Sequence, residues 1–108
     1  MTGEERRRAP RYRLVAAAEI VELRSNATVN AKTSDVSLVG CFMNTARSFP
    51  EGTRIRLKLT KDEASFTSMG VVVRLQPMGM GISFSEMKKE QAEVLRKWLL
   101  EVSRGPQN

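Results

Sequence analysis

The sequence contains no histidine, one cysteine and two aspartates among its 108 residues. The absence of histidine removes the commonest general base and the commonest metal ligand. The single cysteine, Cys41, excludes an internal disulfide and every familiar zinc-binding spacing, and it fits a reducing cytoplasm. We therefore expect neither a metal site nor a catalytic constellation, and we interpret the protein as a non-enzyme.

Long apolar runs and aromatic residues are also scarce. No segment approaches the roughly 20 apolar residues that a membrane-spanning helix needs, and the basic N-terminus lacks the apolar segment of a signal peptide. These absences favour a cytoplasmic protein without a membrane span. Aromatic residues form 6% of the chain, and they are not spaced as the stacking platform that single-stranded nucleic-acid binders use.

Positive charge is in excess, because 18 Lys and Arg residues oppose 12 Asp and Glu residues, for a net charge of +6. Five of the cations lie within residues 4–13, and all five are arginines: Arg6, Arg7, Arg8, Arg11 and Arg13. Arginine grips phosphate with two parallel bonds and stacks on planar rings, whereas lysine acts as a point charge. The cluster favours an anionic, planar partner, and a solvated basic tail is the alternative interpretation.

The central part of the chain predicts short antiparallel strands. The clearest alternation lies in residues 53–59, where Ile55, Leu57 and Leu59 point inward and the intervening cations point outward. We interpret this basic face as solvated, and a ligand surface is the alternative. Residues 34–40 predict a polar loop that ends in a glycine. Six segments have strand character: 12–23, 28–33, 41–43, 53–59, 68–75 and 80–84. Strands at this spacing in a small chain favour a barrel.

A helix is predicted after the strands, capped by Ser85 and ended by Gly105-Pro106. Its apolar residues fall on one stripe that includes Trp98, which we expect to pack on the sheet; a place in a ligand pocket is the alternative. The predicted organisation is a single domain with a flexible Arg-rich arm (1–13), an antiparallel β-barrel (14–85) and a C-terminal helix packed on the barrel (86–104).

Two short motifs follow one another in the first part of the chain. Arg7 and Arg11 form an Arg-x-x-x-Arg motif, and Asp35, Ser37 and Gly40 form an Asp-x-Ser-x-x-Gly motif. Each motif alone is weak, but the pair in this order on a β-rich chain is specific. The sequence resembles the PilZ domain family, whose signature consists of these two motifs. Later segments are similar to other landmarks of that family: Pro50-x-Gly52, residues 70–74 and residues 79–84.

The resemblance implies an all-β fold, a six-stranded antiparallel barrel with one C-terminal helix, that binds the bacterial second messenger cyclic di-GMP. It also implies that Arg7 and Arg11 clasp the ligand as the arm wraps over it. Asp35, Ser37 and Gly40 would contact guanine from the barrel side. By the same resemblance, Arg6 is associated with binding a stacked pair of ligand molecules, and Arg8 would assist.

The chemistry of the residues agrees with these roles. Two phosphates need two or more cations, and guanine presents N7 and O6 to an arginine fork. The N1 and N2 donors of guanine need an acceptor, which the Asp35 carboxylate can supply. Arg74 lies outside both motifs and can stack on a guanine face. The alternative is structural: Asp35 and Ser37 would brace a turn, and Gly40 would supply backbone freedom.

The sequence thus favours a non-enzymatic receptor that has no cofactor besides the ligand cyclic di-GMP and signals through an unidentified downstream protein. A small basic β-barrel that binds single-stranded nucleic acid is one alternative, supported by the net charge but opposed by the few aromatic residues. A PilZ-like protein-interaction module without a ligand is the other.

Overall fold

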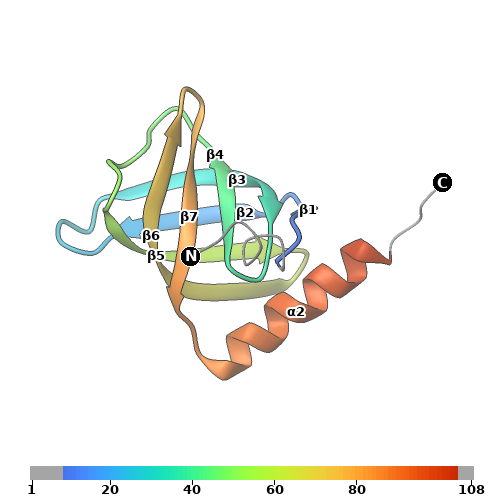
Figure 1. Cartoon of the computed structure of the whole chain (residues 1–108). Helices are drawn as coiled ribbons and strands as arrows, with labels where there is room; N and C mark the ends of the chain where they lie inside the picture. Colours follow the sequence, from blue (N-terminus) through green and yellow to red (C-terminus); the bar gives the residue numbers. More distant parts are fainter. Residues whose placement is uncertain (1–8, 105–108) are drawn as a thin grey trace.

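The computed structural model describes residues 9–104, so the expected roles of Arg6, Arg7 and Arg8 and the Gly105-Pro106 stop signal lie outside the described residues. The described part consists of strands followed by a helix (Figure 1). In chain order these are β1 (Tyr12–Arg13), β2 (Ala17–Glu22), β3 (Thr28–Val36), β4 (Gly40–Asn44), β5 (Arg54–Lys61), β6 (Ala64–Gln76), β7 (Gly79–Glu86) and α2 (Lys89–Ser103).

The strands form one antiparallel sheet that closes on itself. The neighbours run β2-β5-β6-β7-β4-β3, and β3 returns to pair with β2, so β2 to β7 make a six-stranded barrel. The short strand β1 continues the edge of β3 beyond β2, with Tyr12 opposite Val36 and Arg13 opposite Asp35. The expected six-stranded antiparallel barrel with one C-terminal helix is confirmed.

The barrel interior is filled by the inward residues of alternating strands. On β5 the predicted alternation is confirmed, because Ile55, Leu57 and Leu59 are fully buried whereas the cations between them are exposed. Each buried leucine or isoleucine contributes roughly 1.5–3 kcal/mol relative to an exposed one. The alternation therefore fixes which face of β5 points to solvent.

The predicted strand over residues 12–23 is interrupted, and the reason is a buried hydroxyl. Thr33, which is 1% exposed, accepts a hydrogen bond from the Ala16 amide (2.9 Å) and donates one to the Leu14 carbonyl (2.6 Å). The side chain thereby satisfies backbone groups that a regular ladder would otherwise pair. The break separates β1 from β2.

The predicted loop over residues 34–40 is mostly strand. Asp35 belongs to β3, and a shift in the β3–β4 register lies between Thr33 and Asp35. Only residues 37–39 connect β3 to β4. Such a bulge re-aims the side chains that follow it, and Asp35 stands at this point.

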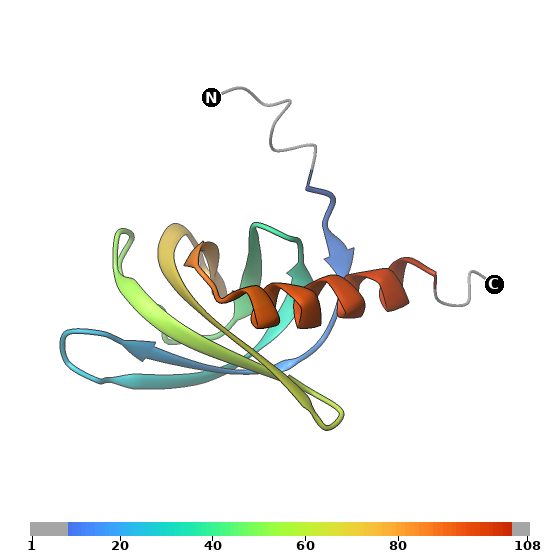
Figure 2. The same cartoon turned by 90° about the horizontal axis from the view of Figure 1, so that it is seen from below.

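The helix begins later than expected. β7 continues to Glu86, so Ser85 belongs to a strand; the N-cap of α2 is Lys88, which makes no side-chain cap hydrogen bond. Trp98 is 5% exposed and meets Phe66 edge-on at a centroid distance of 6.4 Å. This confirms the packing interpretation of Trp98. Figure 2 shows α2 lying along one side of the barrel and reaching β1.

Candidate functional site

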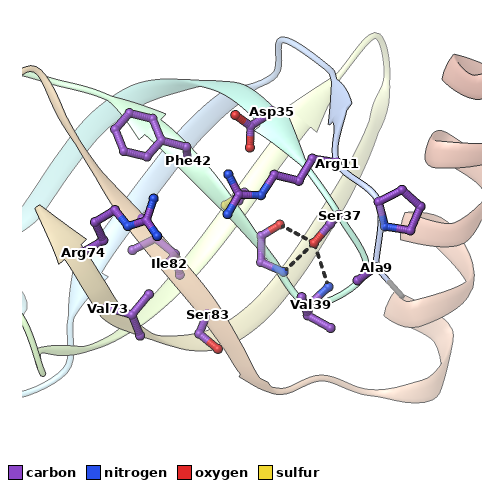
Figure 3. Close-up of a pocket in the computed structure, with 14 residues that line it drawn as sticks. Ala9, Arg11, Asp35, Ser37, Val39, Phe42, Val73, Arg74, Ile82 and Ser83 are labelled. Atoms are coloured by element: carbon purple, nitrogen blue, oxygen red, sulfur yellow. Dashed lines mark hydrogen bonds between the residues drawn. The ribbon is translucent and has the colours of Figure 1, made fainter. Parts of the chain in front are cut away.

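A cavity of about 570 Å³ lies where residues 9–11 approach the barrel wall (Figure 3). Its other walls are the end of β3, the connection to β4, and parts of β4, β6 and β7. Pockets for small ligands usually measure roughly 300–1,000 Å³. The cavity is therefore large enough for a compact organic ligand.

The predicted site residues that the structure describes all line this cavity: Arg11, Asp35, Ser37, Gly40 and Arg74. They come from the segment before β1, from β3, from the turn into β4 and from β6. In Figure 3 the guanidinium groups of Arg11 and Arg74 extend toward each other across the cavity. Separate segments of the chain thus bring two cations and one carboxylate to the same space.

The position of Arg11 follows from the attachment of β1. Tyr12 pairs with Val36 and is packed against the core, and the Leu14 amide donates to the Ser34 carbonyl (3.3 Å). These contacts anchor the chain directly after Arg11, whose side chain is exposed. Arg11 therefore lies at the cavity directly before an anchored strand.

Ser37 is committed to the turn between β3 and β4. Its hydroxyl oxygen accepts hydrogen bonds from the amides of Val39 (3.1 Å) and Gly40 (3.2 Å). The same hydroxyl donates a hydrogen bond to the Gly40 carbonyl oxygen (3.3 Å). The Ser37 amide also donates to the Gly40 carbonyl (2.8 Å). The residue is 3% exposed. These bonds support the bracing role that the sequence left open for Ser37.

Gly40 is required by close packing between two strands. A Cβ atom at this position would overlap the carbonyl oxygen of Ile82 on the neighbouring strand β7. Its backbone is not among the left-handed glycines of the described residues. The glycine therefore serves the close approach of β4 to β7, which neither sequence interpretation of Gly40 included, and the structure gives no support to the backbone freedom that the structural alternative expected.

We expect Gly40→Ala to lower the free energy of unfolding by about 1–3 kcal/mol, because overpacking forces the backbone apart. Thermal unfolding should register a fall of about 4–8 °C for each kcal/mol. Gly81→Ala is the matched control, since its added Cβ would make an ordinary contact with Arg74 (3.4 Å). Equal melting temperatures for the two variants would contradict the assignment.

The cavity floor holds a buried thiol. Burial raises the pKa of Cys41, and the nearby Asp35 carboxylate raises that pKa further. The thiol therefore stays protonated at neutral pH and adds no charge to the cavity. Among the described residues, the charged side chains that line the cavity are those of Arg11, Arg74 and Asp35.

Phe42 and Gly81 are among the lining residues that the sequence did not identify as site residues. Gly81 stands opposite Phe42 on β4 and opposite Arg74 on β6. Gly81 has no side chain, and a Cβ atom at this position would lie 3.4 Å from the Cβ of Arg74 and 3.9 Å from the Phe42 ring. The turn at Pro77-Met78 could have identified Gly81 from the sequence. A two-residue hairpin turn at these positions places Gly81 opposite Arg74.

Two negative findings concern residues 9–104 alone. In this range the structure has no helix whose length and apolar character would let it span a membrane. The same range contains no group of three or more His, Cys, Asp or Glu residues arranged to hold a metal ion.

Comparison with known proteins agrees with this architecture. The family model of the PilZ domain matches residues 5–101. The PilZ domain of YcgR from Escherichia coli with c-di-GMP is similar with a TM-score of 0.76 at 16% identity, over 92% of each chain. No curated protein matches the chain significantly by sequence.

Two further solved structures share the fold. The motility inhibitor MotI/DgrA of Bacillus subtilis has a TM-score of 0.77 at 17% identity, over 93% of this chain and 52% of that one. The chain therefore spans about half the length of MotI/DgrA. The PilZ domain of CeSA from a cellulose-synthesizing bacterium has a TM-score of 0.72 at 11% identity, over 88% of this chain and 99% of that one. At these identities the likeness establishes the fold alone.

Proposed function

Because the chain belongs to the PilZ domain family, we propose that it is a non-enzymatic receptor that binds cyclic di-GMP in the cavity beside residues 9–11. The observation that carries the proposal is the meeting of Arg11, Asp35, Arg74 and the Ser37–Gly40 turn at one cavity of about 570 Å³. The PilZ domain of YcgR, with which the fold is shared, was solved with c-di-GMP.

In this proposal the arginines bind the phosphates. Arg11 lines the cavity directly before the anchored strand β1, and a planar guanidinium forms two charge-assisted hydrogen bonds with a phosphate. Arg7, the first arginine of the Arg-x-x-x-Arg motif, supplies the second cation that holds the phosphates. Arg6 would hold a second, stacked ligand molecule, and Arg8 would assist.

The barrel wall recognises guanine in the same proposal. The Asp35 carboxylate accepts hydrogen bonds from N1 and N2 of one base. Arg74 and Phe42 flank Gly81, where a planar base can stack against a guanidinium and a ring. The buried hydrogen bonds of Ser37 support a role for Ser37 and Gly40 in shaping the turn that faces the base.

Signalling would follow from ordering the arm over the ligand. β1 lies against α2 and β3, so a ligand held by Arg11 adds contacts next to the helix. A protein partner that recognises the ordered arm then distinguishes the bound from the free state by its differential affinity.

Isothermal titration tests this proposal, with cyclic di-GMP as the ligand and GTP and cyclic di-AMP as controls. We expect saturable heat for cyclic di-GMP alone, with micromolar or tighter affinity after the arm's ordering cost. A second ligand molecule per chain supports the role of Arg6, and one molecule per chain contradicts that role. An absence of saturable heat would overturn the receptor proposal.

A further inference from the structure

The outer face of β5 carries a row of cations that the ligand site does not use. Arg54, Arg56 and Lys58 are exposed and alternate with buried residues, so they point outward from one strand. Alternate residues of a strand are spaced by roughly 7 Å. We call these three residues the basic row.

The neighbours of the basic row are mostly neutral. On β2, Val21 stands opposite Arg56 and Glu19 stands opposite Lys58. On β6, the residues opposite the row are Val71, Met69 and Thr67. One carboxylate thus faces three cations, and partly exposed apolar side chains lie beside the arginines.

This pattern differs from a face built only for solubility. Like charges at neighbouring positions repel, and soluble faces intersperse both signs. Within residues 9–104 the ion pair recorded is that of Lys61 with Asp62, outside the basic row. Arginine and methionine beside each other are typical of protein interfaces, which concentrate both residue types.

We propose that the basic row docks an acidic protein surface. Because β5 is hydrogen-bonded to β2 on one side and to β6 on the other, a partner cannot add a strand there and must engage the side chains. Carboxylates at alternate positions of an extended segment have the spacing of the row. The Val21 and Met69 side chains would supply apolar contacts between the charges.

The same face is poorly suited to nucleic acid. The outward residues of β2, β5 and the adjoining half of β6 include no aromatic side chain on which a base could stack. Glu19, opposite Lys58, would repel a phosphate.

The face is joined to the candidate ligand cavity through β6. Val71 lies opposite Arg54 on this face, and Val73 and Arg74, farther along the strand, line the cavity. If the acidic protein is the downstream partner of the receptor, its binding to the basic row rests on the proposed function. The test of this inference is nevertheless independent of the nucleotide.

The experiment compares two triple variants by fluorescence anisotropy. Arg54→Gln, Arg56→Gln and Lys58→Gln together neutralise the basic row. Lys89→Gln, Arg96→Gln and Lys97→Gln together remove the same charge from exposed positions of α2. The probe is a labelled peptide of alternating Glu and Thr, and an oligothymidylate of equal net charge is the second probe.

We expect the basic-row variant to bind the peptide about tenfold more weakly than the wild type, and the helix variant to bind nearly as the wild type does. Equal weakening by both variants, tighter binding of the oligothymidylate, or no peptide binding by the wild type would overturn the proposal. Titration of the basic-row variant with cyclic di-GMP should match the wild type, so failure of this inference is distinguished from failure of the receptor proposal.

Discussion

Replacing Arg11 with alanine should weaken cyclic di-GMP binding about 100-fold, which corresponds to the loss of about 3 kcal/mol of charge-assisted hydrogen bonding. The side chain lines the cavity and is exposed in the free protein. Its removal therefore takes away a ligand contact without opening the core. The free energy of unfolding should change by no more than about 0.5 kcal/mol. Calorimetric titration and thermal unfolding of the same preparation measure both quantities.

Arg13→Ala is the matched control for this variant. Arg13 is also an exposed arginine of the same segment, it pairs with Asp35 through the backbone, and it does not line the cavity. The two variants have the same net charge, so a nonspecific electrostatic effect would weaken binding equally. A fall in affinity for Arg13→Ala as large as that for Arg11→Ala would refute the specific role of Arg11.

Phe66→Ala should lower the free energy of unfolding by about 3–5 kcal/mol, the usual range for removing a buried aromatic ring. Phe66 is fully buried and meets two other aromatic residues edge-on, Phe84 at 5.4 Å and Trp98 at 6.4 Å. The ring connects the end of β7 and the helix α2 to the barrel interior. Its loss leaves a cavity and removes both aromatic contacts. Urea unfolding monitored by Trp98 fluorescence measures the change.

Phe42→Ala is the control for the aromatic substitution itself. Phe42 lines the ligand cavity and is only partly buried, so its removal should cost far less stability than the loss of Phe66. The two variants should also differ in binding, because the proposed site uses the Phe42 ring and not the Phe66 ring. Equal destabilisation by the two substitutions would contradict the assignment of Phe66 to the core that joins helix and barrel.

Local patterns predicted the barrel strands and the helix, because alternation and apolar stripes are local signals. The alternation of β5 identified its inward residues correctly. The interruption between β1 and β2 was not predictable, since it depends on the Thr33 hydroxyl reaching backbone groups 17 and 19 residues away. Ser85 was predicted to be the N-cap of the helix because it directly precedes the apolar residues that have helical spacing. Pairing with β6 carries β7 past it to Glu86.

The site residues that belong to the two sequence motifs were predictable. The residues that reach the site through the order of strands in the sheet were not. Arg11, Asp35, Ser37 and Gly40 belong to the two motifs, and all four line the cavity. Their contacts with a ligand remain proposals, as does that of Arg74. Phe42 was missed because β4 reaches Arg74 only through β7, and that order of strands is not a local property.

Chemical-shift mapping of the ¹⁵N-labelled protein during titration with cyclic di-GMP tests the central claim most directly, since it reports both binding and place. We predict saturable shifts at the amides of Ala9 and Arg11, of the turn from Ser37 to Gly40, and of Phe42, Arg74 and Gly81, which surround the cavity. Amides of β5 should remain unchanged. Shifts confined to the outer face of β5, or no saturable shift, would contradict the assignment of the cavity as a cyclic di-GMP site.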